Sequence, residues 1–429
     1  MRNGVRERLL HLREQPRVDG ASDGQNFIAR LRVLAVVHEI DRRITHAGQL
    51  RRAGLSVFRE REVQHNGFAA VFRVAVVHGG EEIAEAVERV TTSGWFIRGE
   101  ATRTFETQYA RFIGTDHCVG CGNGLDALTL LFMAYKEMGL MADGDEDIVP
   151  ATTYIASILA VTRCRLKPVL VEPDIQTLQI DPQKIEDALT PRTRAMLIVH
   201  LYGKSAYTPE IGNICRMHNL QLVEDNAQAH GCCFGGKRTG SFGDGAHSFY
   251  PTKNLGALGD AGAITTDNAQ LADMVRALGN YGSNRKYVFN HCGINSRLDE
   301  IQAAVLSVKL QYIDRENAQR MANARFYYDH ISNPKIQLLP RTFLQNNVFH
   351  IFPVLCERRD ELKQHLQDRG ISTDVHYPIP PHQQLCYKQW ASLSLPITER
   401  IHKDILSLPI NQTLSQEDLI YVAEALNEF

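Results

Sequence analysis

The sequence predicts an α/β protein whose mostly parallel sheet is covered by helices. Two observations lead to this fold class. From residue 116 onward, short apolar runs alternate with helical patterns, the order typical of parallel strands joined by crossover helices. The chain has 429 residues, 44% hydrophobic and 22% charged, an ordinary composition for a globular protein of two or three domains.

The strands and helices of the expected sheet follow one another in order. The expected strands are DHCVGCG (116–122), EDIVP (146–150), KPVLVEP (167–173), AMLIVHLYG (195–203), LQLVED (220–225), HSFY (247–250) and AITT (263–266). The expected helices between them are LDALTLLFMAYKEMG (125–139), YIASILAVTRC (154–164), PQKIEDALT (182–190) and PEIGNICRMHN (209–219). In such a sheet the ligand binds at the carboxyl ends of the strands, so functional residues are expected just after each strand.

The order of expected helices and strands changes near residue 315, which predicts a second, smaller α/β unit. The stretch 293–313 is the expected connecting helix. Beyond it we expect a helix at 316–332, a strand within 347–357, and helices at 359–370 and 415–429. The sequence therefore predicts a large domain over 81–315 and a small domain over 316–429.

The first 80 residues differ in composition from the rest. They contain 14 arginines, no lysine and 8 acidic residues, while all twelve lysines of the chain lie beyond residue 130. We expect an atypical, poorly ordered extension here, and the arginine-only basic content suggests a misassigned start. An arginine-rich arm that contacts nucleic acid is the alternative, but the segment has no zinc-finger spacing and no convincing helix-turn-helix.

Several other classes of protein are disfavoured. No apolar run is long enough to span a bilayer and no signal peptide is recognisable, so we expect a cytoplasmic protein. Nine cysteines with irregular spacing do not indicate a disulfide framework, and CVGC (118–121) is interpreted as part of a strand rather than a metal site. The stretch GCCFGGKR (231–238) nearly fits a phosphate loop, but Arg238 occupies the place of the Mg²⁺-binding hydroxyl.

Three features converge on a phosphate-bearing cofactor that forms a Schiff base. In GNGLDAL (122–128) a strand ends in glycines and a helix begins, which makes the N–H groups of Gly124 and Leu125 donors to an anion. Asp225 follows an apolar strand, where a carboxylate can hold a pyridinium nitrogen protonated. Lys253 lies 28 residues further on; a loop lysine is ordinarily solvated, but a partly desolvated one is a nucleophile. Ser248 is a candidate phosphate ligand.

The chain resembles the DegT/DnrJ/EryC1/StrS sugar aminotransferases, which are fold type I pyridoxal phosphate enzymes. The stretches that carry the resemblance are EDNAQAHG (224–231), GSFGDGAHSFYPTKNLGALGDAGAITT (240–266), NYGSNRKY (280–287), GINSRLDEIQAAVL (293–306) and HYPIPPHQQLCY (376–387). It runs from about residue 81 to the C-terminus. It implies pyridoxal 5'-phosphate as cofactor and a homodimer with shared active sites.

The resemblance also implies a role for individual residues. Lys253 would form the Schiff base and Asp225 would pair with the pyridine nitrogen. The other implied cofactor contacts are Gly124, Leu125, Tyr154, Ala227, Gln228, Ser248 and, from the neighbouring subunit, Asn295. Trp95, His376 and Tyr377 are candidates for the sugar-nucleotide side, although each fits a packing role equally well. No metal site and no nucleic-acid or membrane partner is expected.

The implied reaction is transfer of the amino group of L-glutamate to a keto sugar nucleotide. The implied acceptor is a dTDP-3-keto-6-deoxyhexose, which would give a dTDP-3-amino-3,6-dideoxyhexose for cell-surface polysaccharide or glycosylated metabolites. Alternatives are a UDP-linked 3-keto sugar, or a non-catalytic cofactor-binding regulator with an N-terminal DNA-binding arm. The family's dehydratase branch has histidine at the lysine position, so Lys253 disfavours that branch.

Two residues depart from the family pattern where apolar side chains are usual. Asp147 lies in an expected strand, where an unpaired buried carboxylate would be costly, and His247 lies in another. We expect either residue to be able to weaken packing near the cofactor.

Overall fold

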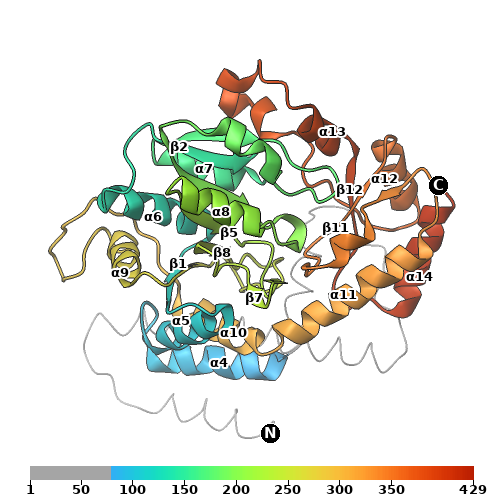
Figure 1. The fold of residues 1–429 in the computed structure, drawn as a ribbon. Helices are drawn as coiled ribbons and strands as arrows, with labels where there is room; N and C mark the ends of the chain where they lie inside the picture. Colours follow the sequence, from blue (N-terminus) through green and yellow to red (C-terminus); the bar gives the residue numbers. More distant parts are fainter. Residues whose placement is uncertain (1–78) are drawn as a thin grey trace, which may run out of the picture. The chain divides into compact units, whose positions relative to one another are not determined.

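The computed structural model describes residues 79–429 (Figure 1). The expectations for the N-terminal extension therefore fall almost entirely on residues outside the described part of the chain. Within that part, no helix combines the length and apolar character that crossing a membrane requires.

A seven-stranded sheet forms the centre of the large unit and confirms the expected α/β class. Its spatial order is β1-β9-β8-β5-β4-β2-β3. The strands are β1 (His117–Cys121), β2 (Glu146–Pro150), β3 (Lys167–Val171), β4 (Thr193–Val199), β5 (Gln221–Asp225), β8 (Asp244–Ser248) and β9 (Gly262–Thr266). All neighbouring pairs from β3 to β8 are parallel, whereas β9 runs antiparallel to both β8 and β1. The carboxyl ends of six strands therefore meet at one edge.

Helices cover both faces of this sheet (Figure 1). Strand side chains alternate between faces, so Val149 packs with α6, α7 and α9 while its neighbour Ile148 packs with α8. A third layer forms where α10 packs against α4 and α5. The helices are α4 (Gly80–Ser93), α5 (Glu100–Ile113), α6 (Gly124–Glu137), α7 (Ile155–Arg163), α8 (Pro209–Met217), α9 (Ala269–Leu278) and α10 (Glu300–Leu310).

The C-terminal part has its own antiparallel sheet and apolar core. The sheet order is β10-β11-β12, and α11, α12 and α14 contribute to the same buried cluster. The elements are α11 (Ile313–His330), β10 (Gln337–Leu338), β11 (Phe352–Leu355), α12 (Arg359–Asp368), α13 (Pro396–Asp404), β12 (Ile405–Leu408) and α14 (Gln416–Asn427). The division into domains at residue 315 stays a prediction, although each of the two segments contains a sheet of its own.

Two expected helices were wrong in part. Residues 182–190 form two single turns of 3₁₀-helix, Pro182–Lys184 and Glu186–Ala188, because so short a segment gains little from helix propagation. The connecting helix begins only at Glu300, because residues 293–299 form no helix: the N–H of Ile294 donates to Leu278 O over 2.8 Å. Tertiary contacts overrode the local helical pattern there.

The two motifs that were rejected as functional sites, at 118–121 and 231–238, have structural roles. Cys118 and Cys121 lie buried on β1 as free thiols, which confirms that CVGC belongs to a strand. The stretch 231–238 contains the two-stranded hairpin of β6 (Cys233–Phe234) and β7 (Lys237–Arg238). Arg238 pairs with Asp314 over 2.8 Å, so its guanidinium is part of an ion pair rather than a phosphate loop.

His247 is fully buried on β8 and well satisfied, contrary to the expectation that it weakens packing. Its Nε2 lies 2.8 Å from Thr265 Oγ1, and that hydroxyl itself donates to Gly240 O. The ring must therefore carry its proton on Nε2, which leaves Nδ1 to accept from Tyr109 over 2.9 Å and from Asn226 over 3.2 Å. Burial lowers the pKa of His247 well below its usual value, so the ring stays neutral.

Asp147 on β2 is the departure that does carry a cost. Its side chain is fully buried, and neither carboxyl oxygen has a hydrogen-bond partner among the described residues. Burial raises its pKa well above the usual range; the backbone of Leu197 opposes this shift without reaching hydrogen-bond geometry. The carboxyl is therefore protonated in the folded protein at pH values where the unfolded chain has ionised it.

We expect Asp147→Val to stabilise the fold at pH 7 by about 2 kcal/mol, the cost of an unpartnered buried polar group. A raised folded-state pKa means that the wild type loses stability as pH rises above about 4, the unfolded-state pKa of Asp. Urea unfolding at pH 5 and pH 7 should therefore show a larger advantage for the variant at pH 7. Asp147→Asn is the matched control, because it keeps the shape and removes only the ionisation. An advantage independent of pH would contradict this assignment.

Candidate active site

The carboxyl edge of the large sheet brings the predicted residues together. Asp225 is the last residue of β5 and Ser248 the last of β8, and these two strands are neighbours in the sheet. Gly124 begins α6 directly after β1, and Tyr154 precedes α7 after β2. Because the strands point the same way, side chains far apart in sequence line one edge.

Asp225 is a buried carboxylate held by two hydrogen bonds. The Ser157 hydroxyl donates to Oδ2 over 2.8 Å, and the Ala227 N–H donates to Oδ1 over 3.1 Å. Burial raises the pKa of Asp225, while these two donors and the positive charge of Lys253 oppose the rise. The arrangement orients the carboxylate for a cationic partner.

Lys253 lies in the loop between β8 and β9. Burial lowers the pKa of its amine to about 8, against the opposing attraction of Asp225. An amine with this pKa is neutral in a useful fraction of molecules at neutral to mildly basic pH, which makes it a nucleophile and a base. The loop is tight, since the Lys253 N–H donates to Tyr250 O over 2.8 Å.

The residues after Lys253 anchor this loop. Asn254 Nδ2 donates to Asn317 Oδ1 over 2.8 Å and to Val348 O over 3.1 Å. The Lys309 amine, from α10, donates to the carbonyl of Gly256. Three segments outside the loop therefore determine where the Lys253 backbone lies.

A cradle for an anion lies between the start of α6 and the end of β8. Asn123 caps the helix by accepting from the Asp126 N–H over 2.8 Å. The N–H groups of Gly124 and Leu125 have no hydrogen-bond acceptor within residues 79–429, so both remain available. A Cβ on Gly124 would lie 2.5 Å from Ser248 Cβ, which shows how closely the two elements approach.

We expect Gly124→Ala to weaken the binding of a phosphate-bearing cofactor roughly tenfold to a hundredfold, because the added methyl group must push β8 away. Equilibrium binding of pyridoxal phosphate, followed by its visible absorbance, measures the change. Gly259→Ala is the matched control, since its Cβ would meet only the Gln302 side chain, at 3.2 Å. Equal binding by both variants would argue against the cradle.

The C-terminal segment reaches the same edge. Gln228 Nε2 donates to the Tyr377 hydroxyl over 3.0 Å, and its Oε1 accepts from the Tyr202 N–H over 2.6 Å. The Tyr202 hydroxyl donates to the carbonyl of His376 over 2.6 Å. The rings of Tyr154 and Tyr377 lie 5.2 Å apart. His376 and Tyr377 are therefore brought to the predicted cofactor residues.

The charge of Lys253 acts on three histidines, of which His230 is buried and His350 and His376 are half-buried. Burial lowers the pKa of His230 to about 3, and it also lowers the pKa values of His350 and His376; the charge of Lys253 adds to each shift. All three rings are therefore neutral near pH 7, which leaves Lys253 as the group suited to move protons.

Two predicted residues are not brought to this cluster by the single chain. Trp95 is 64% exposed, and its indole N–H donates to Ile97 O over 2.8 Å. Asn295 is exposed and forms only a backbone bridge with Asn280. Within residues 79–429 of one chain, no recorded contact joins either side chain to Lys253.

The sequence reasoning missed several residues that shape the site. Ser157 and Asn254 were passed over, and so was the buried pair of His200 and Glu224, whose side chains lie 2.8 Å apart. Glu224 also accepts from the N–H groups of Gly240, Phe242 and Gly243. Two of these residues could have been found from their positions in the sequence: Ser157 lies in the first turn of α7, the helix that follows β2, and Asn254 follows Lys253 directly. The described residues contain no group of three or more side chains able to hold a metal ion.

Comparisons with known proteins agree with this geometry. The chain is 50% identical over 350 residues to the dTDP-3-amino-3,6-dideoxy-alpha-D-galactopyranose transaminase of Aneurinibacillus thermoaerophilus, covering 81% of this chain and 95% of that one. It is 37% identical to the UDP-N-acetyl-3-dehydro-alpha-D-glucosamine 3-aminotransferase of Acidithiobacillus ferrooxidans, covering 81% and 93%. The crystal structure of DesV from S. venezuelae matches with a TM-score of 0.80 and 43% identity, covering 83% and 96%. Residues 77–427 match the model of the DegT/DnrJ/EryC1/StrS aminotransferase family, and the chain belongs to that family.

Proposed function

We propose that this chain is a pyridoxal 5'-phosphate-dependent transaminase that transfers the amino group of L-glutamate to a keto sugar nucleotide. The observation that carries the proposal is the convergence of Lys253, Asp225 and the cradle of Gly124 and Ser248 on one edge of the sheet. The acceptor is a dTDP-3-keto-6-deoxyhexose, giving a dTDP-3-amino-3,6-dideoxyhexose. The transaminase of Aneurinibacillus supports this acceptor by its 50% identity.

The polar groups of the site match the phosphate and the ring of the cofactor. The free N–H groups of Gly124 and Leu125, with the Ser248 hydroxyl, would hold the phosphate. Asp225 would pair with the ring nitrogen, and Gln228 would contact the phenolic oxygen. When bound, pyridoxal phosphate supplies an electron sink for the carbon that loses its proton.

The chain's own residues supply binding and proton transfer. Nζ of Lys253, of which a useful fraction is neutral because of its lowered pKa, would take the α-proton of glutamate and return a proton to the carbon that the cofactor contributes. Asp225 keeps its charge beside a cation because Ser157 and the Ala227 N–H hold it in place. The same two proton transfers in the reverse direction deliver the amine to the sugar, so the kinetics are ping-pong.

The remaining predicted residues would form the walls of the site. Tyr154 would lie over the cofactor ring and Ala227 under it. Tyr377, held by Gln228 over 3.0 Å, and His376 would face the sugar nucleotide. We infer a homodimer in which Asn295 reaches the phosphate of the neighbouring active site and Trp95 faces its substrate. The exposure of both side chains in one chain supports this arrangement.

Purified protein, L-glutamate and a panel of keto sugar nucleotides would test the proposal. We expect 2-oxoglutarate to form with a dTDP-3-keto-6-deoxyhexose, and mass spectrometry to detect the amino sugar. A higher kcat/KM for a UDP-linked 3-keto sugar would favour the alternative acceptor, which the Acidithiobacillus relative exemplifies. No 2-oxoglutarate with any keto sugar nucleotide would contradict the proposal.

The setting of the reaction is also part of the proposal. We place the enzyme in the cytoplasm, supplying amino sugars for cell-surface polysaccharide or glycosylated metabolites. The alternative of a regulator with a DNA-binding arm depends on residues outside the described part of the chain. A gel shift that persists at moderate salt would support that alternative.

A further inference from the structure

A cavity away from the proposed active site lies at the outer edge of β1, between α5 and α9. Its volume is about 370 Å³, and Val119 and Gly120 of β1 form part of its wall. β1 is the last strand of the sheet on this side, so the cavity lies beside the sheet rather than at its carboxyl edge. Ser296, which accepts from the Gly122 N–H over 2.9 Å, separates it from the start of α6.

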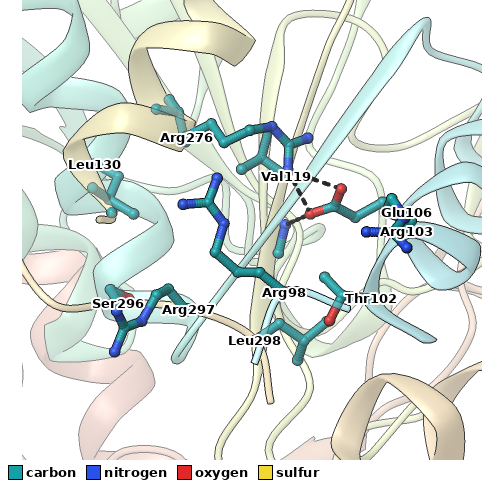
Figure 2. A pocket seen from close by; sticks show the side chains of 13 residues that line it. Arg98, Thr102, Arg103, Glu106, Val119, Leu130, Arg276, Ser296, Arg297 and Leu298 are labelled. Atoms are coloured by element: carbon teal, nitrogen blue, oxygen red, sulfur yellow. Dashed lines mark hydrogen bonds and ion pairs between the residues drawn. The ribbon is translucent and has the colours of Figure 1, made fainter. Parts of the chain in front are cut away.

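Arginines dominate the lining of this cavity. Figure 2 shows the Arg98 guanidinium extending toward Arg276, with Arg297 at the lower left beside Ser296. These residues come from three separate segments: the turn before α5, helix α9 and the stretch before α10. The four lining arginines are Arg98, Arg103, Arg276 and Arg297.

Glu106 is the one carboxylate in this lining, and it is already engaged. It pairs with Arg276 over 3.0 Å and accepts from the Gly120 N–H over 2.8 Å. Arg276 also donates to Cys118 O over 3.4 Å. The pair thus satisfies the free backbone edge of β1, a common way of protecting an edge strand. The charges of Glu106 and Arg276 cancel, so the positive charges of the other three lining arginines are not neutralised within the lining.

Those three guanidiniums have no carboxylate partner among residues 79–429. Arg297 donates to the neutral Asn280 Oδ1 over 3.2 Å, and neither Arg98 nor Arg103 forms an ion pair there. The backbone of Arg98 has φ 53°, a left-handed conformation that is unfavourable for a non-glycine residue. Arg98 is exposed, but partial removal from water and the charges of Arg276 and Arg297 still lower its pKa, while Glu106 opposes the shift. A bound anion would offset the repulsion between these guanidiniums.

We propose that this cavity is a binding site for a diphosphate group. Guanidiniums donate in pairs to phosphate oxygens, and arginines approaching from three directions match the several oxygens of two linked phosphates. The net charge of the lining, three positive, matches a diphosphate of two to three negative charges. The volume of about 370 Å³ is at the small end of the roughly 300–1,000 Å³ typical of ligand sites, and it has room for a diphosphate. The ligand is either free pyrophosphate or the diphosphate of a nucleotide.

Calorimetric titration of the cofactor-saturated full chain with inorganic pyrophosphate tests the site. We expect saturable binding that Arg98→Gln weakens at least about tenfold, since each lost charged contact is worth more than 1.4 kcal/mol. Arg98→Lys keeps the charge without the paired donors and should weaken binding less. Arg111→Gln is the matched control, being an exposed arginine on the same helix as Arg103. It should bind as the wild type does.

A parallel titration with dTDP distinguishes the two sources. Binding of dTDP that depends on Arg98 and is displaced by pyrophosphate identifies a nucleotide, whereas dTDP binding insensitive to Arg98 identifies free pyrophosphate. No pyrophosphate binding, equal binding by Arg98→Gln, or loss of the visible absorbance of the cofactor on titration would each overturn the proposal. So would a change of oligomeric state in Arg98→Gln without pyrophosphate binding to the wild type, because the arginines would then belong to an interface. The assay needs no turnover, so it is independent of the proposed reaction.

Discussion

Lys253→Ala is expected to lower kcat for transamination by on the order of 10⁴-fold, because it removes both the nucleophile and the group that moves the proton. Burial lowers the pKa of Lys253 to about 8, although the negative charge of Asp225 opposes the shift. Lys253→Arg is the matched control: it keeps a cation in the loop, but the guanidinium stays protonated at any usable pH. We expect it to be equally inactive.

Two further measurements accompany the Lys253 variants. Borohydride reduction followed by intact-mass analysis should show covalently retained cofactor in the wild type and none in Lys253→Ala. A small primary amine added to Lys253→Ala should restore part of the activity, which a variant that merely unfolds would not show. Retention of more than a small fraction of wild-type transamination by Lys253→Ala would refute the proposed mechanism.

The second large effect is expected for Asp225→Asn, with kcat lowered by about 10²- to 10³-fold. The amide keeps the size of the side chain but lacks the negative charge that stabilises a protonated ring nitrogen. Ser157→Ala provides a graded comparison, since it removes one hydrogen bond, of 2.8 Å, and leaves the carboxylate. We expect it to lower kcat by about tenfold.

Separate measurement of kcat and KM distinguishes the loss of the Asp225 charge from a general disturbance of the structure. Asp225→Asn should lower kcat in both half-reactions, with glutamate and with the keto sugar, while the protein still binds the cofactor. If Asp225→Asn reacted with glutamate at the wild-type rate, the carboxylate would have no role in stabilising the ring cation.

Much of the fold was predictable because strands and helices of this size have local signatures. The apolar runs that became β1, β2, β3, β4 and β5 were all recognised, as were α6, α7 and α8. One error, at 182–190, arose because the segment is short, and another arose where a local pattern competed with a distant contact. The helical pattern over 293–313 gave way before Glu300, because Ile294 bonds to Leu278. Helix α13 and strand β12 were not predicted from sequence.

Distant contacts also explain why the two departures from the family pattern, His247 and Asp147, have different consequences. His247 and Asp147 looked equally unfavourable as polar residues in buried strands. The fold brings Tyr109, Asn226 and Thr265 to His247, and it brings no hydrogen-bond partner to Asp147 among the described residues. Nothing in the neighbouring sequence distinguishes the two positions, because the partners of His247 are 18 to 138 residues away.

The sequence by itself determined the chemistry of this protein. The order of strands and helices places Asp225, Ser248 and Gly124 at strand ends or helix starts, and the motifs around Lys253 identify the family. Such information is local, because a strand end or a glycine turn is specified by adjacent residues.

Only the tertiary structure decided how these groups are tuned and what surrounds them. It supplied Ser157 to Asp225 across 68 residues, Gln228 to Tyr377 across 149, and the partly desolvated environment that lowers the pKa of Lys253. It also gathered the arginines of the β1 cavity from three segments. Hydrogen bonds, desolvation and charge clustering depend on distances in space, and the spacing of residues along the chain does not specify those distances.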